Sequence, residues 1–170
     1  MNNLIINMLE LAKSEHEETF SKANNNLSKI VELSILSMEV KAYEDNEKIK
    51  YDIENDISML LDEVSIKELL SILIDNAIKH SYKNSTIDIS LKSNGNNIVL
   101  LVKNRGDNIS SEDKDKIFER FYRVDKSRNR NNNRYGLGLA IAKNIVLNHN
   151  GEISVEPDNH ITTFKVAFKK

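Results

Sequence analysis

The chain has 170 residues, a length that suits one domain with a substantial core. Its net charge of −2 gives no reason to expect nucleic acid or an anionic membrane as a partner. The lack of cysteine excludes disulfides and thiolate chemistry, and no apolar run approaches the roughly 20 residues that span a bilayer.

The first structural signal is an apolar stripe near the N-terminus. Its helical spacing predicts a short helix that fades by residues 14–18, and the stripe consists of Leu4, Ile5, Met8, Leu9 and Leu11. A lone amphipathic helix has nothing to pack against, and an exposed apolar stripe usually marks a partner. The same helix can instead fold back onto the domain, and the residues alone leave both interpretations open.

Residues 18–61 predict a second helix followed by two short strands. An extended piece at Glu18–Lys22 leads to a turn and helix start at Asn24–Asn26. The helix then runs from Leu27 to about Ala42, and its expected core-facing residues are Ile30, Val31, Leu33, Leu36 and Val40. Alternating side chains predict a strand at Ile49–Ile53, and Ser58–Leu61 is a second one.

The strongest apolar periodicity lies in Glu68–Ser81, with Asp62 as the expected N-cap of this helix. Within it, Asn76, Lys79 and His80 lie within one turn of each other and can face a common target. A carboxamide beside a lysine and a histidine suits a metal-bridged polyphosphate. Taken alone, the stretch is better explained as a core helix with three solvated polar residues.

The second half of the chain alternates strands with helices, which predicts one mixed sheet covered on one face by helices. A hairpin turn is expected at Ser93–Asn96, and Ser110 or Ser111 caps a short helix before a polar loop from Tyr122 to Arg134. The remaining elements are the strands Thr86–Leu91 and Asn97–Lys103, the helix Gly136–Asn148, and the strands Gly151–Val155 and Thr162–Phe168.

Four stretches occur in an order that is far more specific than any one of them. They are Glu68–Ser81, Val102–Ile109, Ile117–Asp125 and Tyr135–Ala142. In this order they resemble the N, G1, F and G2 boxes of sensor histidine kinases, within the GHKL superfamily. The resemblance implies a two-layer α/β sandwich, the Bergerat-type ATP-binding fold, over residues 18–170. Residues 1–17 would then be the end of a dimerisation-hairpin helix or a linker.

The resemblance assigns the central helix to the phosphates of Mg·ATP. Asn76 stands at the position of the family's magnesium ligand, and Mg²⁺ takes few protein ligands beside water and phosphate oxygens. Lys79 would bring positive charge to the triphosphate. His80 replaces a frequent tyrosine and would pack on the nucleotide or bind a phosphate, although a lone histidine is more often structural.

The resemblance assigns the G1 and G2 boxes to the rest of the nucleotide. Asn104 stands for the family's adenine-binding aspartate, Gly106 lets the backbone approach the base, and Ile109 belongs to the same ATP-binding set. Arg123 matches a lid arginine that reaches toward the γ-phosphate. The G2 box would bind phosphate with the amides of its helix start, and its ATP-binding residues are Tyr135, Gly136, Leu137, Gly138 and Leu139.

The loop between the F and G2 boxes departs from relatives that have extra glycines there, so a stiffer or more cationic lid is expected. The replacing residues are Asn132, Asn133 and Arg134. A solvated loop face is the better explanation for Arg134, Arg128 and Arg130. Leu137 and Leu139 are expected to anchor the G2 loop in the core, and Phe118 and Phe121 to pin the lid to the domain.

Two further positions depart from the family pattern. Ile72 stands four residues before Asn76, where hydrolysing relatives carry a glutamate that activates water and kinases usually carry asparagine. An aliphatic side chain cannot accept a proton, which argues against the gyrase and MutL branches. Kinase chemistry survives, because phosphoryl transfer depends mainly on positioning and charge neutralisation. Asn108 replaces a second G1 glycine, and asparagine tolerates left-handed backbone.

No histidine has the surroundings of a phosphoacceptor. His16–Glu17 copies the first two letters of the family motif without the following Thr-Pro, and His149 and His160 have no motif around them. The chain is therefore expected to be the catalytic ATP-binding part of a sensor kinase. Its implied ligands are ATP and Mg²⁺, and its implied partners are the dimerisation domain that carries the acceptor histidine and the receiver domain of a response regulator.

The resemblance also implies a cytoplasmic domain of a membrane-bound parent, with no membrane contact by this stretch. Two other functions remain open. One is a serine kinase of the anti-sigma-factor type, against which Leu4–Leu11 and the aromatic box at Phe118–Arg123 argue. The other is a degenerate nucleotide sensor without transfer activity, suggested by Ile72, Asn104 and the missing lid glycines.

Overall fold

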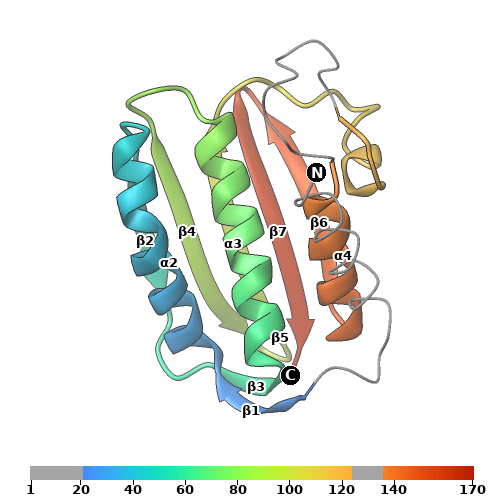
Figure 1. The fold of residues 1–170 in the computed structure, drawn as a ribbon. Helices are drawn as coiled ribbons and strands as arrows, with labels where there is room; N and C mark the ends of the chain where they lie inside the picture. The colour runs from blue at the N-terminus through green and yellow to red at the C-terminus, as the bar shows by residue number, and fades with distance from the viewer. Residues whose placement is uncertain (1–20, 124–135) are drawn as a thin grey trace, which may run out of the picture.

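A mixed sheet of five strands, in the order β2-β4-β5-β7-β6, forms one layer of the structure (Figure 1). The computed structural model describes residues 21–123 and 136–170. The β2–β4 pair is parallel, and the other neighbouring pairs are antiparallel. The strands are β2 (Lys48–Ile53), β4 (Thr86–Asn94), β5 (Asn97–Arg105), β6 (Glu152–Asp158) and β7 (Ile161–Lys169).

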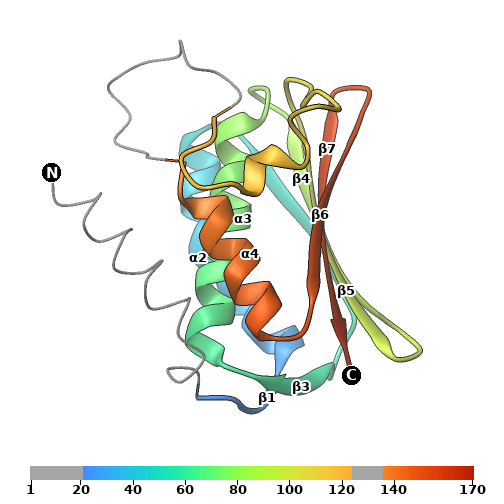
Figure 2. The same ribbon diagram turned by 90° about the vertical axis from the view of Figure 1, so that its right-hand side faces the viewer.

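In the described residues, helices cover one face of this sheet and leave the other face bare (Figure 2). They are α2 (Leu27–Glu44), α3 (Glu63–His80) and α4 (Gly138–Asn148). The strands alternate accordingly: on β4, Ile87, Ile89 and Leu91 are buried under the helices, whereas Asp88 and Lys92 are exposed. The expected two-layer α/β sandwich is confirmed. No helix in the described ranges is long and apolar enough to cross a membrane.

A small antiparallel sheet, in which β1 (Ala23–Asn26) pairs with β3 (Ser58–Leu61), closes one end of the sandwich. The predicted turn at Asn24–Asn26 is wrong, because pairing with β3 keeps this asparagine run extended against its local preference for turns. The last of the three residues still starts the next helix, since Asn26 Oδ1 accepts a hydrogen bond from Lys29 N at 2.9 Å.

The helix α3 begins earlier than its apolar run predicts, at Glu63 rather than Glu68. Asp62 is the N-cap, as expected, and its Oδ2 accepts a hydrogen bond from Ser65 N at 2.9 Å. The first turn escapes a search for an apolar run because polar Glu63, Ser65 and Lys67 flank its two apolar residues. Leu70 and Leu73 then lie fully buried against the sheet.

His149 is a structural residue at the end of α4. Its Nδ1 donates to Ile145 O at 2.7 Å, and its Nε2 accepts a hydrogen bond from Asp62 N at 3.0 Å. The ring is therefore neutral in the fold, and burial lowers its pKa below the ordinary range. These bonds join the C-terminal end of α4 to the start of α3.

The outer face of α2 corrects part of the predicted core. Leu33, Leu36 and Val40 were expected to face the core, yet 48%, 53% and 68% of their surfaces are exposed. The buried residues of the helix are instead Leu27, Ser28, Ile30, Val31, Ser34, Ile35 and Ala42. Because α2 carries apolar residues on both faces, its periodicity does not identify the face that the sheet covers.

The placement of α2 leads to a paired prediction. Leu36→Ala is expected to lower the free energy of unfolding by less than about 0.5 kcal/mol, because this side chain lies mostly in water. Ile35→Val removes a smaller group from a fully buried side chain and is expected to cost about 1 kcal/mol. Urea denaturation of both variants measures the difference. A larger loss for Leu36→Ala would mean that α2 is rotated about its axis.

Candidate functional site

Asn104 lies near the end of β5 with its side chain buried. The residue is 3% exposed, and its Nδ2 has no hydrogen-bond partner among the described residues. Its backbone pairs with Thr162 of β7, and the pairing of β5 with β4 ends one residue earlier, at Lys103. Leaving a buried donor unpaired costs about 1–3 kcal/mol. A ligand that offers an acceptor here would recover that energy.

Gly106 brings the end of β5 against the C-terminal end of α3. A Cβ at this position would lie 1.8 Å from the His80 carbonyl oxygen and 3.3 Å from Asn104 Nδ2. Ser81 and Gly106 also form an isolated antiparallel bridge, so the two backbones are in contact. The glycine therefore permits a close approach, as expected, but the neighbour observed is His80. Its approach to a base stays a prediction.

The polar residues predicted to bind phosphate lie on the C-terminal part of α3. Asn76 and Lys79 are partly buried, and His80 is exposed. The Lys79 ammonium forms a salt bridge with Asp75, and the same carboxylate pairs with Lys41 of α2. Asp75 thus ties α2 to α3 and holds Lys79 at the helix surface. A contact between Lys79 and a triphosphate stays a prediction.

The G2 residues lead into the N-terminus of α4. Gly136 adopts a left-handed φ of +68°, and the helix begins at Gly138, two residues later than predicted. The N-cap residue Leu137 makes no side-chain capping bond, so this cap leaves the first-turn amides for another acceptor. Leu137 is buried and Leu139 packs against the core, which confirms both as anchors.

Ile72 lies directly beneath the start of α4. Its Cγ2 is 3.5 Å from the position of a Cβ on Gly138, an ordinary van der Waals distance. The side chain is half-buried and packs against the hydrophobic core. The residue that departs from the family pattern therefore serves packing between α3 and α4.

The end of the F box meets the first G2 glycine. Phe121 N donates to Gly136 O at 3.1 Å, and a Cβ on Gly136 would lie 2.7 Å from Tyr122 O. Phe118 packs edge-on against Phe164, with ring centroids 6.3 Å apart, whereas Phe121 is 54% exposed. The predicted aromatic pinning is right for Phe118 and wrong for Phe121, whose backbone makes the contact instead of its ring.

A hydrogen-bonded cluster ties the F box to the segment that follows β5. The hydroxyls of Ser110 and Tyr122 both donate to the Asp113 carboxylate, and these bonds lower its pKa. The same contact raises the pKa of Tyr122. Ser110 Oγ also accepts a hydrogen bond from Asp113 N at 3.1 Å, in the turn that precedes the short 3₁₀ helix Lys116–Phe118. The N-cap of that helix is Asp115, which makes no side-chain capping bond, so the prediction that Ser110 or Ser111 caps it is wrong.

Residues 61–170 match the family described as "Histidine kinase-, DNA gyrase B-, and HSP90-like ATPase". The chain belongs to this family. The match supports an ATP-binding domain.

The curated relatives of this ATPase domain are sensor kinases. The sensor protein CiaH of Streptococcus pneumoniae is 38% identical over 134 residues, which are 77% of this chain and 30% of that protein. The sensor protein DltS of Streptococcus agalactiae is 37% identical over 149 residues, 88% of this chain and 37% of that protein. The chain thus spans about a third of the length of these relatives. Their names favour the sensor-kinase interpretation over the anti-sigma-type serine kinase.

Solved structures of histidine kinases share the fold. The catalytic domain of histidine kinase ThkA superposes with a TM-score of 0.78 at 25% identity, covering 89% of this chain and 97% of that one. Full-length ShkA in complex with AMPPNP gives a TM-score of 0.85 at 19% identity, covering 98% of this chain and 35% of that one. The second likeness concerns the fold alone.

Several predicted residues of the ATPase site lie outside the described ranges. They are Tyr135, the lid residues Arg128, Arg130, Asn132, Asn133 and Arg134, and the N-terminal segment 1–17 with its apolar stripe and His16. Arg123 is exposed at the edge of the described part, and its contact with a γ-phosphate stays a prediction. Ile109 packs partly buried against the core.

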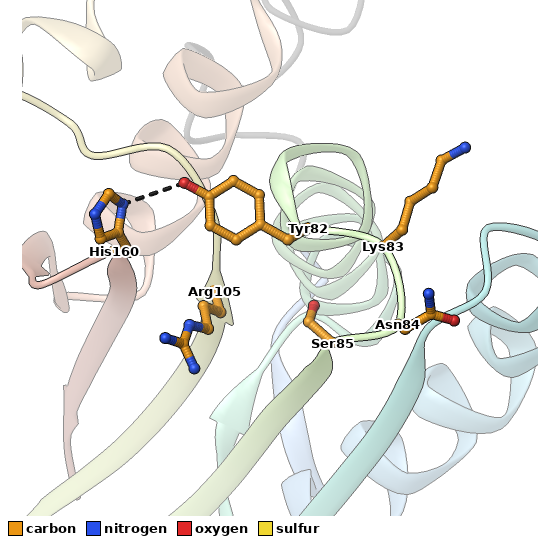
Figure 3. Close-up of a pocket in the computed structure, with 6 residues that line it drawn as sticks. All are labelled: Tyr82, Lys83, Asn84, Ser85, Arg105 and His160. Carbon is orange, nitrogen blue, oxygen red and sulfur yellow. Dashed lines mark hydrogen bonds between the residues drawn. The ribbon is translucent and has the colours of Figure 1, made fainter.

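Tyr82 and His160 lie near the site, although sequence reasoning did not place them there. The Tyr82 hydroxyl lies 3.1 Å from His160 Nδ1, although the two are 78 positions apart in the sequence (Figure 3). With Lys83, Asn84, Ser85 and Arg105 they line a cavity of about 420 Å³. His160 has no surrounding motif, so no local signal points to this contact.

Proposed function

We propose that this domain binds Mg·ATP and donates the γ-phosphoryl group to a histidine on the dimerisation domain of a sensor kinase. The group then passes to an aspartate of a response-regulator receiver domain. The parent kinase lies in the cell membrane with this domain on its cytoplasmic side. The dimerisation domain and the membrane anchor are proposed by analogy with the kinase relatives, of which these residues cover about a third. The observation that carries it is the buried, unpartnered amide nitrogen of Asn104.

The Asn104 carboxamide suits adenine. Its oxygen can accept a hydrogen bond from the 6-amino group, and its Nδ2 can donate to the neighbouring ring nitrogen. Gly106 lies directly beside this amide, which leaves the approach to it free of a side chain. Binding of a base would therefore supply the acceptor that Nδ2 lacks among the described residues.

The phosphates would lie between α3 and the start of α4. The uncapped amides of an 11-residue helix attract phosphate oxygens at its N-terminus. Asn76 would give Mg²⁺ one oxygen ligand, and no cluster of three acidic or histidine side chains occurs in the described residues to hold the ion alone. Mg²⁺ commonly completes its octahedron with water and phosphate oxygens. Lys79 and Arg123 would neutralise the remaining charge.

The chemistry that these residues support is in-line transfer. The bond between the γ-phosphorus and the bridging oxygen of ADP breaks as a bond to the acceptor imidazole nitrogen forms. Ile72 packs in the core and cannot activate a water molecule, so it favours transfer over hydrolysis. The domain contributes orientation and charge neutralisation, which supply most of the catalysis in phosphoryl transfer.

Calorimetric titration of ATP tests the role of Asn76. Mg²⁺ is expected to tighten ATP binding, and Asn76→Ala to weaken Mg·ATP binding at least about tenfold, since the ion loses its protein ligand. Asn96→Ala, in the exposed turn between β4 and β5, is the matched control and should bind as the wild type does. An ATP affinity that changes neither with Mg²⁺ nor with Asn76→Ala would contradict the assignment of α3 to the phosphates.

A transfer assay tests the reaction itself. The domain is mixed with a purified dimerisation domain of a sensor kinase and γ-labelled ATP, and label is expected on a histidine of that domain. Label on a serine of an anti-anti-sigma protein would instead identify the serine-kinase alternative. Binding without transfer to any acceptor would leave a nucleotide sensor, and label on this chain would contradict a separate phosphoacceptor.

A further inference from the structure

The loop Gly106–Asn108, here called the G1 loop, follows the buried Asn104 and is tied to two other segments. One is the connection between α3 and β4, through Tyr82, and the other is the turn between β6 and β7, through His160. Figure 3 shows Tyr82 and His160 pointing toward each other from these two segments. The nucleotide-binding roles proposed for the domain use neither residue.

The Tyr82 hydroxyl connects the two segments to the loop. It lies 3.1 Å from Asp107 Oδ1 and 3.1 Å from His160 Nδ1. A carboxylate only accepts, so the single hydroxyl hydrogen goes to Asp107, and the histidine must donate through Nδ1–H to the phenolic oxygen. Partial burial and the bond to Asp107 raise the pKa of Tyr82, which keeps that hydrogen in place at neutral pH.

The backbone of His160 holds the loop at two more points. His160 N donates to Asn108 Oδ1 at 2.7 Å, and His160 O accepts a hydrogen bond from Gly106 N at 2.8 Å. Asn108 is not among the residues with positive φ, so the expectation that it uses left-handed backbone is wrong. The asparagine that replaces a family glycine instead uses its side chain as an acceptor for the turn.

The position of the G1 loop governs the surroundings of Asn104. Gly106 packs directly beside the Asn104 amide and the His80 carbonyl. An asparagine amide can rotate by half a turn and exchange its donor and acceptor. In one orientation it matches adenine, and in the other it matches guanine, which offers an acceptor and a ring N–H. Asparagine therefore selects adenine only if its neighbours hold one orientation.

We propose that Tyr82, Asn108 and His160 are positioning residues that hold the G1 loop against Asn104 and so set the preference of the site for adenine over guanine. The inference rests on the proposed function, because it requires a purine base at Asn104. The three residues act through the loop and are not assigned a contact with the nucleotide.

The test compares ATP and GTP affinities by calorimetry in the presence of Mg²⁺. Tyr82→Phe removes the hydrogen bond of the Tyr82 hydroxyl to Asp107, and Asn108→Gly removes the acceptor of His160 N. For each variant we expect the ratio of ATP to GTP affinity to fall about two- to tenfold, the usual effect of one hydrogen bond. His160→Ala should lower the ratio similarly. His160→Asn keeps a side-chain N–H near Nδ1 and tolerates the φ of +65°, so it should restore most of the ratio.

Tyr43→Phe, on an 82% exposed tyrosine of α2, is the matched control and should leave the ratio unchanged. A purely structural role of the ties would lower the melting temperature with no change in the ratio, and that result overturns the inference. Unchanged selectivity in a domain that binds ATP overturns this inference alone. A wild-type domain that binds no ATP overturns the proposed function together with it.

Discussion

Gly106→Ala is expected to cost more than about 3 kcal/mol of unfolding free energy, or to prevent folding. The added Cβ would lie 1.8 Å from the His80 carbonyl oxygen, a backbone atom that no side-chain rotation can move away. The loop cannot retreat either, because Gly106 N is bonded to His160 O at 2.8 Å. Urea denaturation followed by circular dichroism measures the loss.

Gly95→Ala is the control for this substitution. Gly95 has a φ of +60°, and an added Cβ there would have no neighbouring atom within 4 Å, so alanine meets backbone strain without a clash. The expected cost is about 1 kcal/mol. If Gly106→Ala costs no more than Gly95→Ala, the end of β5 does not touch α3 as closely as the structure has it.

The contact also separates two roles of the G1 glycine. Family resemblance gives Gly106 a role toward the base, whereas the structure gives it a role in joining β5 to the helix that carries Asn76 and His80. The second role exists without any ligand. Loss of nucleotide binding in a Gly106 variant would therefore not by itself demonstrate a contact with the base.

The fold was predictable because four motifs in order identify a family, and the family carries a topology. Residue alternation and capping preferences correctly predicted the strands and the Asp62 cap. Such local patterns gave wrong predictions where contacts with distant segments determine the structure. Asn24–Asn26 has the composition of a turn, yet β3 offers it a partner. Leu36 has the character of a core residue, yet the sheet covers the opposite face of α2.

The candidate site was predictable only in its parts that stand in motifs. Asn104 and Gly106 lie at the end of β5, as the G1 box predicts, whereas α4 begins two residues later than predicted, and the nucleotide contacts of these residues stay predictions. The ties of the G1 loop were not predictable, because Asn108 and His160 meet across 52 positions of sequence through a backbone bond. Contacts of this kind depend on the register of β5, β6 and β7, which no single segment specifies.

A second large effect is expected from pH, through Glu47, the residue before β2. The residue is 5% exposed, and its Oε2 has no partner among the described residues. Burial raises the pKa of this carboxyl from 4.5 to about 7, a hydrogen bond with Ser81 acts against the increase, and the Asp45 carboxylate adds to it. Glu47 is thus largely protonated in the fold below neutral pH.

The sign of the effect follows from proton binding. Between pH 4.5 and about 7 the folded state binds more protons at Glu47 than the unfolded chain does, so stability falls as pH rises through this window. At about 1.4 kcal/mol per unit, the whole window is worth about 3 kcal/mol. His149 acts with the opposite sign, because its lowered pKa removes stability as pH falls below 6.5.

Glu47→Gln isolates the contribution of this carboxyl, since His149 is present in both proteins and cancels in the difference. The amide stays neutral at every pH, so the variant is expected to be about 2–3 kcal/mol more stable than the wild type at pH 8 and less than about 1 kcal/mol more stable at pH 5. Glu44→Gln, at an exposed position on α2, should follow the wild type throughout. Urea denaturation across this pH range gives the comparison.

A difference that stays constant with pH would mean that Glu47 is ionised in the fold. A difference that grows with pH would show that the Glu47 carboxyl is protonated in the fold at low pH.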